Sequence, residues 1–143
     1  MPGPPPHPDE SSRLAALHAL NILESEREER FDRLTRLAQR VFIADVLYAY
    51  AVRLATATRE HKQVRVGVSP RGVIALTRAA QAYALIGGRG YVVPEDIKAL
   101  IEPVFAHRLL LAPDAAMRGV TPSEVIRTVV EAVAAPSPAA ARD

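Results

Sequence analysis

The chain has 143 residues, of which 49% are hydrophobic and 24% charged, and its formal net charge is +2 at pH 7. This length fits one domain with extensions, and the composition is that of a globular protein. Because Cys is absent, disulfides and thiolate metal sites are excluded. The small net charge argues against nucleic acid as a partner, and no apolar run approaches the ~20 residues that span a bilayer. With no signal peptide at its N-terminus, the chain is expected to be cytoplasmic, with neither a membrane nor a nucleic-acid partner.

The two ends of the chain predict disorder. Residues 1–11 form a Pro-rich arm, and residues 136–143 form a tail rich in Pro and Ala. Between them, apolar residues recur at helical spacing. This spacing predicts a short helix over 12–23, a second over about 28–42 and a third over about 44–60. The third helix places four residues on one face: Leu47, Tyr50, Leu54 and Thr58.

The fourth predicted helix has the clearest start. Ser69 can cap its free N–H groups, Pro70 fits the first helical position, and Gly87 or Gly88 supplies the positive φ that favours a helix end. Its apolar stripe consists of Val73, Leu76, Ala80, Tyr83 and Ala84.

Two further helices begin with similar signals. A fifth begins at Pro94, and Pro103 within it predicts a kink or a restart. A last helix begins at the capping box Thr121-Pro122-Ser123-Glu124. Alternating valines over 64–68 and the apolar segment over 107–111 predict short extended pieces. We therefore expect an all-α fold, a small helical bundle with a minor two-stranded β element.

The chain lacks the residues of an independent enzyme. A P-loop needs Gly-Lys followed by Ser or Thr, and neither Lys62 nor Lys98 has this context. Glu95 and Asp96 follow a proline and are predicted to be first-turn helix residues rather than magnesium ligands. His107 is predicted to be a packed or capping residue, and no histidine pair has metal-ligand spacing. The sequence thus predicts no catalytic residue, no metal site and no enzymatic activity of the chain on its own.

Arg71 is the one charged residue that local physics does not explain. A cation in the first helical turn opposes the helix dipole. A Ser-Pro-Arg start also points backbone N–H groups and a guanidinium the same way, which favours a phosphate-facing site. An exposed arginine is, however, often a structurally neutral surface residue, and Arg78 is predicted to be a solvated arginine or a partner contact.

Residues over about 43–133 resemble the C-terminal lid domain of MoxR-family AAA+ ATPases. The resemblance rests on Tyr50, Thr58-Arg59-Glu60-His61, Gly67 to Arg71, Ala79-Ala80, Gly88-Arg89, Tyr91-Val92, Pro94-Glu95-Asp96, Pro103-Val104 and His107-Arg108. One departure is Val93, where the family often has a Thr, with the loss of a cap worth about 1 kcal/mol. The resemblance implies an AAA+ lid over residues 43–135.

The resemblance also implies a function and partners. It assigns Arg71 as the sensor-2 arginine that reaches the ATP phosphates, with Ser69 and Pro70 shaping the helix start. ATP and Mg²⁺ would be held by an AAA+ core domain, which has no counterpart in this sequence. The implied partners are that core or ring subunits, and von Willebrand A-domain proteins, in chaperone-like maturation of other proteins.

Residues 13–42 resemble the opening helices of a bacterial GAF domain, through A-L-x-A-L-x-I-L and E-E-R-F-D-R-L-T-R-L-A. The sheet that forms the ligand pocket of that domain has no counterpart, so no ligand sensing is implied. We expect a truncated or fused reading frame, in which residues 12–42 are a helical extension before the lid. The alternative is a genuine extension that pads the lid.

Two functions from different classes remain open at this stage. One is a detached lid that docks on an AAA+ core and contributes Arg71. The other is an ATP-independent helical module for protein interaction or regulation. Dependence of binding on Arg71 separates them.

Overall fold

The computed structural model describes residue 29, residues 32–33 and residues 35–137. The chain divides into two compact units, residues 1–36 and residues 37–143. The described residues of the first unit are helical. The predicted arm over 1–11, the predicted helix over 12–23 and residues 138–143 of the predicted tail lie outside the described residues, as does most of the GAF-like stretch.

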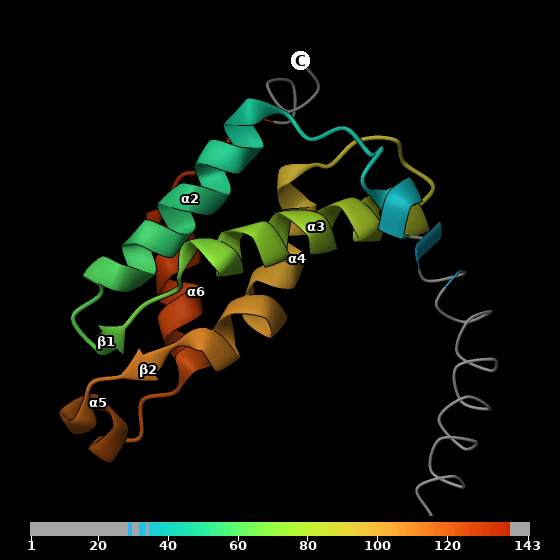
Figure 1. Ribbon diagram of the computed structural model, residues 1–143. Helices are drawn as coiled ribbons and strands as arrows, with labels where there is room; N and C mark the ends of the chain where they lie inside the picture. The colour runs from blue at the N-terminus through green and yellow to red at the C-terminus, as the bar shows by residue number, and fades with distance from the viewer. Residues whose placement is uncertain (1–28, 30–31, 34, 138–143) are drawn as a thin grey trace, which may run out of the picture. The chain divides into compact units, whose positions relative to one another are not determined.

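The second unit is built from helices and one pair of short strands (Figure 1). Val64 lies opposite Leu111 and Val66 opposite Leu110 in an antiparallel pair. The predicted helical bundle with a minor two-stranded element is confirmed. In chain order the elements are α2 (Asp45–Glu60), β1 (Val64–Val66), α3 (Pro70–Ile86), α4 (Pro94–Phe105), the 3-10 turn η1 (Ala106–Arg108), β2 (Leu110–Leu111), α5 (Pro113–Met117) and α6 (Pro122–Ala132).

Four helices close around one hydrophobic core. Helix α2 contacts α3 and α6, and α4 contacts the same two helices. The predicted inner face of α2 is fully buried, and so are the centres of the other three inner faces. Tyr83 is an exception, because it is 47% exposed although we predicted it in the apolar stripe of α3. The core residues of α3, α4 and α6 include Leu76, Ala80, Ala84, Ile97, Ile101, Phe105, Val125, Ile126 and Val129.

Helices α3 to α6 all begin at a proline. The fixed φ of proline suits the first helical position, and the residue before it is driven into extended conformation. Helix α6 adds the predicted capping box. Its Thr121 hydroxyl accepts from the Glu124 N–H at 3.3 Å, and the Glu124 carboxylate accepts from the Thr121 N–H at 2.7 Å.

A half-buried ion pair holds the turn between α3 and α4. Gly88 has the positive φ, 71°, that we predicted at this helix end. Arg89 donates two hydrogen bonds, of 2.8 and 2.6 Å, to the carboxylate of Asp96, which is 2% exposed. The same carboxylate accepts from the Val93 N–H at 2.9 Å, so α4 is capped from within although valine has no side-chain acceptor. Asp96 also raises the pKa of Arg89 above its usual value.

The predicted helix over 28–42 ends earlier than we expected. Its described residues are helical as far as Ala38, and residues 39–40 form a turn. Phe42 instead makes a parallel bridge with Tyr91, in which the Phe42 N–H donates to Gly90 and the Phe42 carbonyl accepts from Val92, both at 2.9 Å. These hydrogen bonds require an extended backbone, which overrides the helical pattern.

The region after α4 also differs from the prediction. Helix α4 continues through Pro103 without the restart we allowed for, and the change to 3-10 geometry comes at Ala106. The strand expected over 107–111 therefore begins only at Leu110. Helix α5 was not predicted, although Pro113 carries the same start signal as the other helices.

Candidate functional site

The start of α3 is defined by its backbone rather than by the Ser69 hydroxyl. Ser69 has extended geometry, with φ −76° and ψ 165°, and its carbonyl accepts from the Gly72 N–H at 2.8 Å. Its side chain makes no capping hydrogen bond, so the predicted cap is wrong for the hydroxyl. Ser69 is exposed, and water competes for that hydroxyl.

A buried threonine ties this helix start to α2. The Thr58 hydroxyl accepts from the Val68 N–H at 3.0 Å and donates to the Ala55 carbonyl at 2.6 Å. Thr58 and Val68 are both fully buried. A buried N–H left without an acceptor costs about 1–3 kcal/mol, so this bond fixes the residue that immediately precedes Ser69.

Gly67 allows the chain to pass close to the end of α2. A Cβ atom at this position would lie 2.5 Å from Cγ of Arg59 and 2.6 Å from its Cα and N atoms. No larger residue fits without displacing backbone. Arg59 itself donates to the Thr56 hydroxyl at 3.0 Å. Residues that are eight or more positions apart in the sequence thus converge on the start of α3.

Gly72 is buried although Arg71 beside it is exposed. A Cβ atom at Gly72 would collide with Cγ1 of Val68 and lie 3.4 Å from Cδ of Arg108. Arg108 reaches this point from the end of α4, where its Nε donates to the Val104 carbonyl at 3.0 Å. His107 caps the same helix end, with Nδ1 3.2 Å from the Pro103 carbonyl, which confirms the predicted capping histidine.

Arg71 lies on the solvent-exposed side of the first turn of α3. It is exposed, and the first turn of α3 contains no acidic residue. Over the part of the chain that the structure describes, the ion pairs join Arg36 to Asp32, Arg89 to Asp96 and Arg118 to Asp114. Arg71 belongs to none of them.

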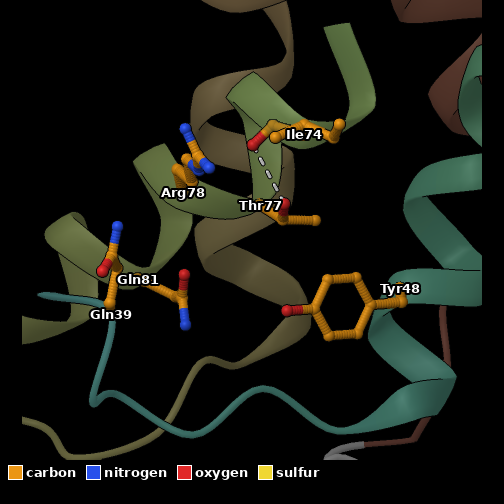
Figure 2. A pocket seen from close by; sticks show the side chains of 6 residues that line it. All are labelled: Gln39, Tyr48, Ile74, Thr77, Arg78 and Gln81. Carbon is orange, nitrogen blue, oxygen red and sulfur yellow. Dashed lines mark hydrogen bonds between the residues drawn. The ribbon is translucent and has the colours of Figure 1, made fainter. Parts of the chain in front are cut away.

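The face of α3 that carries Arg71 continues into a hollow of about 490 Å³ (Figure 2). Ile74 follows Arg71 by three residues and Arg78 follows Ile74 by four, which places all three on one helix face. Tyr48 of α2 lines the same hollow, and in Figure 2 its hydroxyl points toward the side that Gln81 lines. The hollow is lined by Gln39, Tyr48, Ile74, Thr77, Arg78 and Gln81.

Sequence reasoning missed this hollow. Ile74 lies outside the apolar stripe of α3 and is 51% exposed, which in hindsight marks a second face. Gln81 is buried, and its amide nitrogen donates to the Val41 carbonyl at 2.8 Å. That contact joins positions 40 residues apart, and helical periodicity carries no such information. Arg78, expected to be solvated or a partner contact, is exposed at the rim.

Of the two acids at the start of α4, Asp96 has a structural role. Asp96 is fully engaged by Arg89 and Val93, as predicted for a first-turn residue, and Glu95 is exposed. Across residues 35–137 and the described positions before them, no group of three His, Cys, Asp or Glu residues is arranged to hold a metal ion.

Comparison with known proteins identifies the family. The pattern of the AAA lid domain family matches residues 56–129, just over half of the chain. The chain is 43% identical to the uncharacterized protein YeaC of Bacillus subtilis, over 71% of this chain and 32% of YeaC. It is 37% identical to chaperone MoxR1 of Mycobacterium tuberculosis, over 70% of this chain and 29% of MoxR1. The chain belongs to the AAA lid domain family, as a lid of the MoxR type.

A solved structure agrees with this assignment. The lid superposes with a TM-score of 0.68 and 31% identity on a crystal structure from Cytophaga hutchinsonii, described as that of a candidate ATPase. The match covers 71% of the chain and 34% of that structure. The lid chain thus spans about a third of the length of these relatives. Among its described helices, none is both long and apolar enough to cross a bilayer.

Proposed function

We propose that this lid contributes Arg71 to the phosphates of ATP held by an AAA+ core domain. Ser69 and Pro70 shape the helix start that presents it. The observation that carries the proposal is an exposed guanidinium in the first turn of α3, with no ion-pair partner among the described residues and no acid in that turn. A cation there opposes the helix dipole, and a bound anion reverses that penalty because it attracts both the guanidinium and the free N–H groups.

The rigid surroundings of Arg71 support this role. Thr58 fixes the residue before the helix, Gly67 brings the chain against α2, and Gly72 is covered by Val68 and Arg108. A group that stabilises charge during phosphoryl transfer acts best when it is already in position. The described residues offer no cluster for Mg²⁺, so the proposal assigns the metal to acids of the core domain.

The wider role of the lid follows from its relatives. MoxR1 is named a chaperone. We extend the proposal to a lid that works with an AAA+ core or with ring subunits in chaperone-like maturation of other proteins, including von Willebrand A-domain proteins. ATP turnover in this arrangement is a property of the core and lid together.

The test combines the full chain with a MoxR-type core domain prepared without its own lid. A fluorescent ATP analogue is titrated with Mg²⁺ into the mixture and into each component alone. We expect the chain to increase the affinity of the core for the analogue, and Arg71→Ala to remove about tenfold or more of that gain, as a charge-assisted hydrogen bond worth about 1.5–3 kcal/mol requires.

The matched control is Arg127→Ala, which removes an exposed arginine from α6. It should leave the affinity unchanged. If Arg71→Ala behaves like this control while the chain still increases the affinity, the assignment of Arg71 is wrong. Saturable binding by the chain alone that survives Arg71→Ala would reveal a nucleotide site elsewhere in the chain.

The alternative is an ATP-independent module for protein interaction or regulation. The observation that favours it is the exposure of Tyr48, Val52 and Ile74, which are 42%, 48% and 51% exposed on α2 and α3. Tyr48 and Ile74 line the same hollow, and exposed apolar side chains that lie together are typical of a partner site. Binding of a protein partner that depends on Ile74 and not on Arg71 or ATP would favour this function.

A further inference from the structure

The side chain of Arg108 is tied back to helix α4 through its Nε atom. Its Cα belongs to η1, directly after α4, and its Nε donates to the Val104 carbonyl at 3.0 Å. A hydrogen bond from an arginine to a carbonyl of the last helical turn satisfies an acceptor that the helix leaves free. The side-chain stem is thereby fixed in direction.

The stem of Arg108 lies over the residue that follows Arg71. Gly72 has no side chain, and the nearest atoms to its missing Cβ are Cγ1 of Val68 and Cδ of Arg108. These two side chains cover Gly72. Gly72 is therefore buried, although Arg71 before it and Ile74 two residues after it are exposed. Long charged side chains commonly cover apolar or backbone surface in this way while their charged end stays in water.

We propose that Arg108 is a positioning residue for Arg71. Its stem packs on the bare backbone of Gly72 and holds the first turn of α3 against the end of α4, so that the Arg71 guanidinium points in one direction. The inference rests on the proposed function of Arg71. Gly72 is needed for this contact, because a methyl group there would displace Val68 and press on Arg108.

The competing explanation is that Arg108 contacts the anion itself. An arginine has five N–H donors, and only Nε is engaged by Val104, so the rest of the guanidinium is available. The two explanations differ in what Arg108 requires. A positioning residue acts through Arg71, whereas a direct ligand keeps its effect when Arg71 is removed.

The first experiment uses the full chain alone and measures hydrogen exchange of the Gly72 N–H by NMR. This N–H donates to Ser69 at 2.8 Å and reports whether the first turn is closed. We expect Arg108→Ala to accelerate exchange by about tenfold, since it uncovers the turn, and Arg127→Ala to leave it unchanged. Arg108→Met keeps the stem without the charge and should lie close to the original protein. Unchanged exchange in Arg108→Ala would overturn the proposal.

The second experiment is a double-mutant cycle in the mixture with the MoxR-type core and the ATP analogue. We expect Arg108→Ala to weaken binding about fivefold to tenfold, as misplacement of a contacting group does, and to have no effect when Arg71→Ala is already present. Arg108→Met should restore most of the affinity. An undiminished effect of Arg108→Ala in the Arg71→Ala background would make Arg108 a direct ligand and overturn the positioning role.

These outcomes separate the two proposals. If Arg71→Ala has no effect on the mixture, the proposed function fails, and hydrogen exchange at Gly72 still decides whether Arg108 holds the helix start. If Arg71→Ala weakens binding and Arg108→Ala does not, the proposed function stands and the positioning role is wrong. Thermal unfolding of each variant identifies any loss of fold. If Arg108→Ala does not fold, the Arg108→Met variant, whose stem is intact, decides whether Arg108 has the positioning role.

Discussion

Helix α3 has an arginine near each end, and the two differ in their exposure and in their hydrogen-bond partners. Arg89, just after the C-terminal end, makes two hydrogen bonds to the buried carboxylate of Asp96. Arg71, in the first turn, is exposed and joins none of the ion pairs of the described chain. The helix dipole favours a cation at the C-terminal end, where Arg89 lies, and opposes one in the first turn, where Arg71 lies. Arg89 thus has its partner within the fold, whereas the partner proposed for Arg71 is an ATP phosphate from outside it.

The largest effect should follow from breaking the pair at the C-terminal end. Asp96→Ala leaves Arg89 without its partner and the Val93 N–H without its acceptor. We expect a loss of about 2–4 kcal/mol in the free energy of unfolding, below the full cost of a broken buried pair because Arg89 is partly exposed. Urea denaturation measures this, and Glu95→Ala, which removes an exposed acid, serves as the control. Similar losses in both variants would contradict the structural role of Asp96.

The next largest effect is expected for Thr58, whose hydroxyl holds the residue before the start of α3. Thr58→Val keeps the shape of the side chain and removes the acceptor of the buried Val68 N–H. We expect a loss of about 1–3 kcal/mol in the free energy of unfolding, together with faster hydrogen exchange at Gly72. Thr128→Val is the matched control, because the Thr128 hydroxyl bonds to Glu124 on an exposed face. If stability falls while exchange at Gly72 stays constant, Thr58 supports the core without fixing the start of α3.

A smaller effect distinguishes two helix starts. Thr121→Ala removes a formed cap from α6 and should cost about 1 kcal/mol, whereas Ser69→Ala removes a hydroxyl that caps nothing and should cost a few tenths at most. Hydrogen bonds from Thr121 lower the pKa of Glu124. Their contribution is therefore present above the ordinary pKa of a Glu carboxyl and is lost as the pH falls through the lower value in the folded state. The stability difference between Thr121→Ala and the original protein should accordingly shrink in acid. An equal cost for Ser69→Ala would show that its hydroxyl caps α3 in solution.

The smallest effect on stability is expected for Arg71 itself. Arg71→Ala should change the free energy of unfolding by less than about 0.5 kcal/mol, with a slight gain because a cation leaves the positive end of the helix. The comparison variant is Arg89→Ala, which abandons a buried carboxylate and should be clearly destabilising. Thermal or urea unfolding of the two variants side by side decides. A comparable loss in both would make Arg71 a structural residue.

Local signals in the sequence predicted much of the lid. The prolines at 70, 94 and 122 marked three helix starts. The inner face of α2 and, apart from Tyr83, that of α3 followed from helical spacing. The unusual position of Arg71 was also recognisable from the sequence, because Ser69 and Pro70 mark a helix start and a cation directly after them opposes the helix dipole. Helix α5 could have been found from Pro113 by the same argument.

The remaining features depend on contacts between distant residues. The bridge of Phe42 to Tyr91 ends a helix that its own pattern favours. The hollow forms where Gln39, Tyr48 and Ile74 meet, and Gln81 is held there by Val41. Arg108 comes to lie over Gly72 only because α4 and α3 pack together. In each case a hydrogen bond or a packing contact outside the range of helical periodicity decides the outcome.

The proline at the start of α3 also limits how this helix can move. Helix α3 cannot lengthen upstream, since the residue before a proline is kept out of helical conformation. With 17 residues it is a stiff rod of about 25 Å. At its other end, the left-handed backbone of Gly88 leads directly into Arg89, which pairs with the buried carboxylate of Asp96. Both ends of helix α3 are therefore fixed, by Pro70 at the start and by Gly88 with the Arg89–Asp96 pair at the end.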